Sequence, residues 1–413
     1  MSEHAPSVLP GRSSPPPRQP EPPPASRTPS TGRLVGIDLA RGLAVLGMYA
    51  AHVGPDPTMG GPLGFVLELA RGRASALFAL LAGFSLVLIT GRPHPHTGRA
   101  GRQAVVRIVI RSVVLMALGF ALTALDTDVD VILSFYGLLF LAILPLYRLS
   151  ARTLAVIAAA GALVLPQLLY VIRQSIEGGD WADTVVAGDP LARITGTDGF
   201  MELLFTGEYP VLTWMSFMVA GMAVARLDLT RGRTLAQLSC AGGALALIGY
   251  GGSWLALHLV PHAGDTVAAA TDGASPGSAW WSDTVGYLTD GTPADWLLVA
   301  APHSQTTFSI LGNTGVALAV VAACVAAADR LPRLVRLATP VTAVGMTALT
   351  AYVLHILAIR AVGMREETGP ALLSLLLFTA TAMLLATVWT RHFRRGPLEH
   401  LLHTATLPAR RVG

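Results

Sequence analysis

Ten long apolar runs constrain this chain more than any other feature of its sequence. A helix needs about 20 mostly apolar residues to cross the hydrocarbon core of a bilayer. The runs lie near residues 34–53, 64–90, 104–124, 131–147, 153–172, 209–226, 235–260, 304–328, 340–361 and 370–390. They predict an all-α integral membrane protein with about ten transmembrane helices.

The composition agrees with a protein that lies mostly in lipid. Only 13% of the 413 residues are charged and 52% are hydrophobic, whereas an average soluble domain carries about 25% charged residues. This composition excludes a soluble enzyme, a disordered protein and a nucleic-acid binder. The net charge of +4 is better explained by membrane topology than by a nucleic-acid partner.

The arginines indicate how the chain is oriented. If the N-terminus is cytoplasmic and ten spans alternate, 22 of the 29 basic residues fall on the cytoplasmic side and six outside, in agreement with the positive-inside rule. We therefore expect a multi-pass protein of the cell membrane with both termini in the cytoplasm. The lipid bilayer is the expected environment of the protein. The sequence does not specify an oligomeric state.

The chain is expected to hold one membrane domain between two short tails. Residues 1–33 contain ten prolines and no apolar core, so they predict a disordered cytoplasmic tail and not a signal peptide. The membrane domain is expected at 34–403 and a second cytoplasmic tail at 404–413. Two long outer segments, 173–208 and 261–303, have lengths typical of a lid or a binding loop.

Three ionisable residues lie in the first apolar run, at Asp38, Arg41 and His52. Such residues are costly inside a span, so they are expected to face the protein interior and to serve function. At about 100° per residue, Arg41 and His52 lie within about 20° of the same helix face and about 16 Å apart along the axis. Asp38 is placed to pair with Arg41 at i,i+3.

Each of these residues also has a structural interpretation. Asp38 and Arg41 could form an ion pair that only fixes the depth of the helix in the membrane, because charges near the interface can extend to water. His52 could be an interfacial histidine bonded to a backbone carbonyl.

The second run begins with Glu68, Arg71 and Arg73 at its outer end. Glu68 and Arg71 have the i,i+3 spacing of a surface ion pair at the membrane boundary. The functional interpretation places these residues in the outer wall of a pocket that His52 enters, where they would orient an acceptor or an acyl oxygen.

Further polar and aromatic residues are expected at the same outer depth, namely Tyr209, His303, Tyr352 and His355. Each is a candidate for acceptor binding or for oxyanion stabilisation, and packing or interface anchoring is the alternative for each. No metal site is predicted, because His94 and His96 have no third ligand near them in the sequence.

At these residues the chain resembles the transmembrane acyltransferases. The spacing of Arg41 and His52 matches the first span of acyltransferase family 3, and Asp38-x-x-Arg41-Gly42 is similar to the heparan-alpha-glucosaminide N-acetyltransferase-like branch. The segments GEYPVLTWMSFMVAGMAVARLDL, PHSQTTFSILGNTGVALAV, VGMTALTAYVLHIL and FRRGPLEHLL look like those of an uncharacterised bacterial branch. The resemblance covers roughly residues 33–403.

The resemblance implies an enzyme that moves an acyl group, by expectation acetyl, from cytoplasmic acyl-CoA to a hydroxyl or amine of an extracytoplasmic glycan or related acceptor. Acyl-CoA is then a co-substrate, and no bound cofactor is expected. His52 would be the catalytic base or nucleophile, and Arg41 would help to bind the donor. The chain departs from the heparan branch in one respect. The segment after the first run reads VGPDPTMGGPLG and lacks the catalytic histidine of that branch, so His52 alone carries the role.

The competing function is a transporter or flippase for a small or lipid-linked solute, without acyl transfer. Ten spans and charged residues inside them fit this class equally well. Transporters often show internal symmetry and broken helices in matched positions, and the sequence indicates neither.

Overall fold

The chain forms one helical bundle in a computed structural model that describes Met1 and residues 31–271, 276–282, 292–363 and 371–412. Within these residues every regular element is a helix, which confirms the all-α class. The expected disordered tail, 1–33, lies almost entirely outside the described residues. The larger helices are α1 (Thr31–Val53), α2 (Gly61–Ala70), α3 (Arg73–Thr90), α4 (Gly98–Thr123), α5 (Ile132–Ile143), α6 (Ala151–Glu177), α9 (Val211–Ala225), α10 (Gly232–Ala246), α11 (Gly252–Leu259), α13 (Thr307–Arg330), α15 (Thr339–Met346), α16 (Ala348–Val362) and α17 (Ala371–His392).

Six of the described helical segments are long and apolar enough to cross a membrane. They are Gly61–Thr90, Gly98–Thr123, Ala151–Glu177, Gly232–Leu259, Thr307–Arg330 and Ala371–His392. A seventh span arises if α15 and α16 together count as one. The chain therefore has the helices of a multi-pass membrane protein, and each of the ten predicted runs falls on one to three of its helices. Ten spans and cytoplasmic termini stay predictions.

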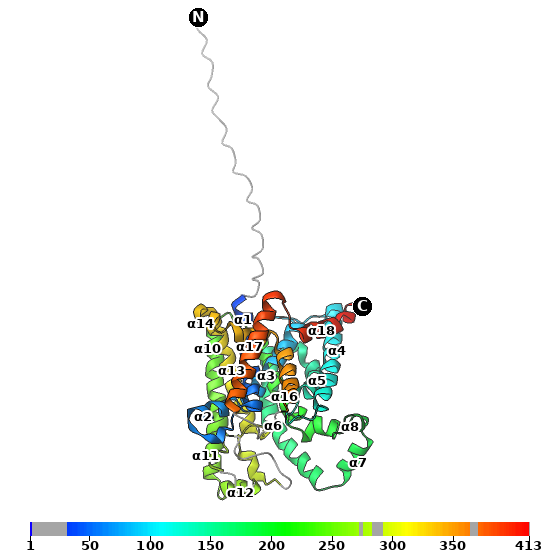
Figure 1. The fold of residues 1–413 in the computed structure, drawn as a ribbon, viewed down its shortest axis with the longest axis vertical. Helices are drawn as coiled ribbons and strands as arrows, with labels where there is room; N and C mark the ends of the chain where they lie inside the picture. Colours follow the sequence, from blue (N-terminus) through cyan, green and yellow to red (C-terminus); the bar gives the residue numbers. More distant parts are fainter. Residues whose placement is uncertain (2–30, 272–275, 283–291, 364–370, 413) are drawn as a thin grey trace.

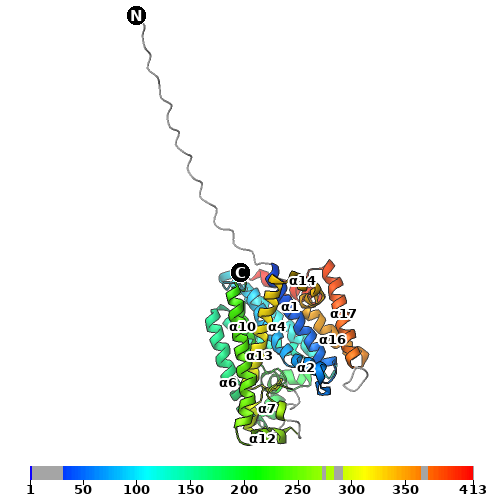
Figure 2. The ribbon, with the colours of Figure 1, turned by 90° about the vertical axis from the view of Figure 1, so that its left-hand side faces the viewer.

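The start of α1 and the short helix α18 (Pro397–Ala405) lie at one end of the bundle, which we call the terminal end (Figure 1). Three other short helices, α7 (Trp181–Gly188), α8 (Pro190–Thr195) and α12 (Ala263–Ala270), lie at the opposite or distal end (Figures 1 and 2). These three helices belong to the two segments expected as long outer loops. The helix α14 (Pro332–Leu337) is again at the terminal end.

Helix α1 occupies the middle of the bundle because its glycines permit close contact with three neighbours. A Cβ on Gly36 would lie 2.6 Å from the Val325 Cα of α13, and one on Gly47 would lie 2.8 Å from the Ala74 Cβ of α3. On a third side, Gly42 faces the backbone of α15. Small residues that let backbones approach are the usual basis of helix packing in lipid. This packing fixes the side chains that α1 carries.

The break between α15 and α16 is the largest deviation from straight spans. The two helices meet at an angle of 89° around Thr347, where the sequence predicted one continuous span, 340–361. The new N-terminus of α16 is capped by Glu399 of α18, whose carboxylate accepts hydrogen bonds from the Leu349 and Thr350 amides at 2.7 and 3.2 Å. A carboxylate at this position satisfies exposed amides and the positive end of the helix dipole. The sequence contained no sign of this break, and a single bent pair does not contradict the prediction that broken helices in matched positions are absent.

The segment expected as a second cytoplasmic tail, 404–413, is described as far as residue 412 and packs against the bundle. After α18 the chain continues in a 3₁₀ helix, Leu407–Arg411, which packs against α4. Gln103 of α4 donates its amide to the carbonyl oxygens of Arg410 and Val412, both at 3.1 Å. These hydrogen bonds hold the C-terminal segment against the start of α4.

Candidate functional site

A pair of histidines joins α1 to α16. His52 Nδ1 lies 2.8 Å from His355 Nε2, and the two rings stack with centroids 5.1 Å apart and planes 10° apart. His355 is buried, whereas His52 is partly accessible. The sequence predicted both residues as separate candidates, and the structure brings them into direct contact.

The hydrogen bonds of this pair define the protonation of each ring when both are neutral. His355 Nδ1 lies against the carbonyl oxygen of Tyr352, which can only accept, so Nδ1 carries the proton. Nε2 of His355 is then an acceptor, and His52 Nδ1 must donate to it. A neutral imidazole holds one proton, so His52 Nε2 keeps its lone pair. The pair therefore presents one basic nitrogen, on the residue that is accessible.

Tyr49 forms a second contact between α1 and α16, next to the histidine pair. Its hydroxyl donates to the carbonyl oxygen of Ala351 at 2.8 Å, and its ring centroid lies 4.6 Å from that of His355. Sequence reasoning missed this residue, because a tyrosine in an apolar run is usually a packing residue. Its position three residues before His52 was the available signal.

The segment after the 3₁₀ helix η7 (Ala294–Leu298) brings a third histidine toward the same region. His303 Nδ1 lies 2.7 Å from Glu208 Oε1, and Tyr209 and Trp214 surround its ring at centroid distances of 5.4 and 5.9 Å. His303 has a positive φ of 58°, an uncommon conformation for a residue with a side chain. His303 and Arg71 are both within electrostatic range of His52. Sequence reasoning missed Glu208.

Asp130, in the loop between α4 and α5, adds a carboxyl group near His303 and Glu208. Its pKa is raised to about 6, first by desolvation and then by the negative charge of Glu208, while His303 acts in the opposite direction. The sequence had assigned Asp130 only to an acidic outer loop. It belongs to the same group of charges at the distal side of the histidine pair.

Glu68 and the two arginines after it are fixed in the turn between α2 and α3. Arg73 is buried and donates to the Glu68 carbonyl oxygen at 2.9 Å, to the Tyr250 hydroxyl at 3.1 Å and to the Trp281 carbonyl oxygen. Glu68 is also buried. Arg73 therefore connects this turn to α10–α11 and to the distal segment, which is a structural role. Arg71 is the member of this group that lies near His52.

Tyr352 likewise has a structural contact in addition to its place on α16. It is buried, and its hydroxyl accepts a hydrogen bond from the Ile132 amide at the start of α5, at 3.2 Å. Tyr209 packs edge-on against Trp214 at 4.8 Å. Tyr352 supports His355 through its carbonyl oxygen, and Tyr209 supports His303 through ring contact.

Asp38 and Arg41 form the expected ion pair closer to the terminal end. The distance from Arg41 Nη1 to Asp38 Oδ1 is 2.8 Å, and the two side chains are 22% and 25% exposed. Arg41 also donates to the Gly345 carbonyl oxygen and to the Ser85 hydroxyl, both at 3.3 Å. Asp38 and Arg41 thus join α1 to α15 and α3, and they do not contact the histidine pair.

A long apolar groove lies between α16 and α17. Its volume is about 1140 Å³, and its wall includes Tyr49 and His355. Trp389, His392 and Phe393, near the terminal end of α17, line its other end. The groove therefore reaches the hydrogen-bond partner of His52 from the direction of the terminal end.

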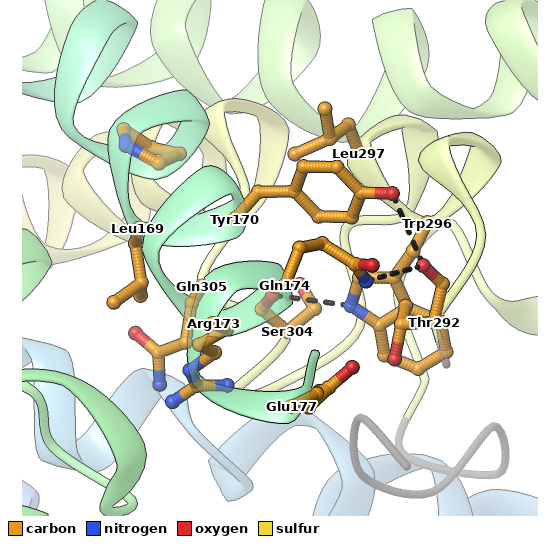
Figure 3. Close-up of a pocket in the computed structure, with 11 residues that line it drawn as sticks. Leu169, Tyr170, Arg173, Gln174, Glu177, Thr292, Trp296, Leu297, Ser304 and Gln305 are labelled. Carbon is orange, nitrogen blue, oxygen red and sulfur yellow. Dashed lines mark hydrogen bonds between the residues drawn. The ribbon is translucent and has the colours of Figure 1, made fainter. Parts of the chain in front are cut away.

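A smaller pocket at the distal end is filled by its own side chains (Figure 3). Tyr170 and Gln174 of α6 donate to the Thr292 carbonyl oxygen at 3.1 and 3.0 Å, and Trp296 donates to Ser304. The remaining volume is about 20 Å³, which is close to the space of one water molecule. These hydrogen bonds hold the segment that carries His303 in place. The remaining space is too small for an acceptor.

No group of three or more histidine, cysteine, aspartate or glutamate residues that could hold a metal ion is present among the described residues. The site is instead a set of histidines, carboxylates and arginines on an all-helical scaffold with several membrane-spanning helices. This is the architecture of a multi-span membrane protein with an intramembrane polar site.

The sequence of the chain matches the models of two known protein families. Residues 33–260, more than half of the chain, match the model of heparan-alpha-glucosaminide N-acetyltransferase, catalytic. The chain belongs to this family, as the resemblance predicted. Residues 279–409 match a second family, described as a protein of unknown function (DUF418). No curated protein matches the chain. The histidine pair combines the two matched regions, because His52 comes from the first and His355 from the second.

Proposed function

We propose that this protein is a membrane acetyltransferase that uses His52 to transfer an acyl group from cytoplasmic acyl-CoA to a hydroxyl or amine on the far side of the membrane. The observation that carries the proposal is the hydrogen-bond chain from Tyr352 through His355 to His52. It fixes the tautomer of His52 and leaves a basic nitrogen, in the manner of nucleophile–base arrangements whose base is oriented by a third group. Membership of the acetyltransferase family supports the reaction class.

In the direct route, His52 Nε2 takes the proton of the acceptor hydroxyl or amine. The oxygen or nitrogen of the acceptor attacks the thioester carbonyl carbon at the same time. The carbon–sulfur bond then breaks, and CoA leaves as the thiolate, which recovers a proton from the imidazolium. Arg71 and His303, which are within electrostatic range of His52, would stabilise the developing oxyanion or orient the acceptor. Glu208 would hold His303 in place.

In the covalent route, His52 Nε2 attacks the thioester carbonyl carbon, the carbon–sulfur bond breaks, and CoA leaves as the thiolate. The acceptor then attacks the acyl carbon, the bond from that carbon to Nε2 breaks, and the acceptor's proton passes to the thiolate. The hydrogen bond from His52 Nδ1 to His355 would then offset the positive charge that develops on the acylated ring. The two routes differ kinetically, because a covalent intermediate gives ping-pong behaviour.

Donor access is the second part of the proposal. The groove along α16 and α17 offers a path for the acyl arm from the terminal end toward His355. Arg41, fixed by Asp38 on the same side of the bundle, would attract the anionic donor. A glycan or a related small molecule is the proposed acceptor.

The experiment uses inside-out vesicles that contain the purified full chain and acetyl-CoA labelled in its acetyl group. We expect label on an amine or hydroxyl acceptor enclosed in the lumen, and no label in vesicles that carry His52→Ala. His94→Ala is the matched control, since His94 is an exposed histidine outside the site. Label that enters the lumen while still attached to CoA would indicate transport and contradict acyl transfer.

A transporter is the second candidate, and one observation favours it. The 89° break between α15 and α16 resembles the discontinuous helices that form substrate sites in transporters. Under this hypothesis, the groove would conduct a solute and the histidine pair would bind it without chemistry. The vesicle experiment separates the two functions.

A further inference from the structure

A second cavity lies at the terminal end, between α4 and the C-terminal segment. Its volume is about 280 Å³. The lining residues are Leu88, Ile89, His96, Arg107, Arg111, His403, Thr406, Leu407 and Arg410. None of these described residues is acidic, and five of the nine are arginine or histidine. The cavity therefore concentrates positive charge.

The three arginines of this cavity come from two parts of the chain. Arg107 and Arg111 are one helical turn apart on α4, so they project from the same face. Arg410 lies opposite them, where the hydrogen bonds of Gln103 to the Arg410 and Val412 carbonyl oxygens fix the backbone. Among the described residues, none of the three forms a salt bridge with a carboxylate.

One acid lies near the cavity but forms no salt bridge with its three arginines among the described residues. Glu399 of α18 is within electrostatic range of Arg111, but its carboxylate is used to cap α16 through Leu349 and Thr350. The pKa of His403 lies below its usual value, first because the ring is partly desolvated and then because Arg395, Arg410, His400 and Arg107 surround it with positive charge. Both observations describe a site with unbalanced positive charge.

Like charges brought together by folding cost free energy unless a ligand balances them. Guanidinium groups match the oxygens of phosphates particularly well, because they donate parallel hydrogen bonds in a fixed plane. We propose that this basic cavity binds the phosphate groups of a polyanionic ligand, with Arg107, Arg111 and Arg410 as the main donors.

The site would depend on both matched regions of the chain, because α4 belongs to the first and the C-terminal segment to the second. Two sources can supply the phosphates, namely a soluble nucleotide, such as the 3′-phosphorylated ADP part of CoA, and the headgroup of an anionic lipid. The proposal concerns a site separate from the histidine pair, and it is tested by binding without any transfer reaction. Its failure would therefore leave the proposed acyl transfer untouched.

The experiment titrates the purified full chain in neutral detergent with inorganic pyrophosphate and with adenosine 3′,5′-bisphosphate, and measures the dissociation constant and the shift in Tm. The same protein in nanodiscs of phosphatidylcholine, with or without phosphatidic acid, tests the lipid source. We expect binding that weakens as salt is added, because the interaction is between charges. A response to a soluble probe identifies a nucleotide-type source, whereas a response to phosphatidic acid alone identifies a lipid headgroup.

Arg111→Gln and Arg410→Gln should each weaken binding about tenfold or more, which is the usual effect of losing a charge-assisted hydrogen bond. Arg410 is exposed, so its variant tests the proposal even if Arg111→Gln fails to fold. Arg233→Gln, at an exposed arginine of α10, is the matched control and should bind as the wild type does. The proposal is overturned if no probe binds, if sulfate at equal ionic strength binds as well, or if Arg410→Gln and Arg233→Gln bind equally.

Discussion

At the scale of single residues, the ion pair of Asp38 and Arg41 allows structural and functional roles to be separated. Removing either partner leaves a partly buried charge without its counterpart. The losses of stability in the two single variants should therefore add up to more than the loss in the double variant. We expect the Asp38→Asn and Arg41→Gln cycle to show a coupling on the order of 1 kcal/mol in the free energy of unfolding.

The exposed pair of Asp228 and Arg231 has the same i,i+3 spacing and a distance of 3.1 Å, so it serves as the control. Its coupling should be smaller, about 0.3–0.5 kcal/mol, within the range of other exposed surface pairs. For the donor role, folded Arg41→Gln should bind acyl-CoA more weakly than the wild type. Unchanged affinity in that variant would remove Arg41 from donor binding.

Asp130 gives a prediction about pH. Its pKa in the folded protein is about 6, above the ordinary value of 3.8, so the ionised carboxylate disfavours the folded state. The stabilising contribution of the protonated group is complete below about pH 4 and is lost as the pH rises through 6. Asp130→Asn should therefore have a higher Tm than the wild type at pH 7.5, and the difference should shrink toward zero near pH 4.

Asp128→Asn, two positions earlier in the same loop, is the comparison for this measurement and should show a smaller change. If Asp130→Asn melts below the wild type at pH 7.5, the carboxylate stabilises the distal site and the assignment of its environment is wrong.

The site shows what local sequence patterns can and cannot reveal about single residues. The helical period placed Asp38 next to Arg41 and both on the side of His52, and the structure confirms the ion pair. The contact between His52 and His355 spans 303 residues of sequence and depends on how α1 and α16 pack, which no local pattern specifies. Glu208 was missed for the same reason.

At the scale of helices, glycine contacts decide which spans lie side by side. A Cβ on Gly83 of α3 would lie 1.9 Å from the Met218 carbonyl oxygen of α9, and one on Gly221 of α9 would lie 1.8 Å from the Leu80 carbonyl oxygen. These two helices therefore touch through their backbones. Gly83→Ala should lower the free energy of unfolding by about 1–3 kcal/mol, because the helices must separate to admit the methyl group.

Gly243 of α10 is the control for this prediction, since nothing lies within 4 Å of a Cβ placed there. Gly243→Ala should leave stability unchanged or raise it slightly through higher helix propensity. Thermal unfolding in one detergent measures both variants. Equal behaviour of the two variants would show that the close contact of α3 and α9 does not limit stability.

The helices themselves were largely predictable, whereas the break in one of them was not. Apolar run length located every large helix, because burial in lipid requires it. The bend at Thr347 has no proline or glycine at its centre. There the Thr347 hydroxyl bonds to the Ala343 carbonyl oxygen at 3.1 Å, and Glu399, 52 positions further along the chain, caps the new helix. A contact that distant in sequence leaves no local signal.

At the scale of the whole molecule, the predicted topology places the terminal end in the cytoplasm and the distal end outside. Single cysteines at position 280 and in the C-terminal segment test this in a background without Cys240 and Cys324. An impermeant thiol reagent should label position 280 in intact cells, and the C-terminal position only after the membrane is opened. Protection of position 280 in intact cells would reverse or refute the topology.

The central claim is that the His52–His355 pair acts on the thioester of an acyl-CoA, and release of free CoA thiol by the purified protein tests it most directly. Wild type and His94→Ala should release thiol from acetyl-CoA in the presence of an amine or hydroxyl acceptor. His52→Ala should lose about 10²–10⁴-fold in rate while keeping its Tm, in line with the contribution of a general base. A loss of less than about tenfold in folded His52→Ala, or no thiol release by the wild type with any acceptor, would contradict the account.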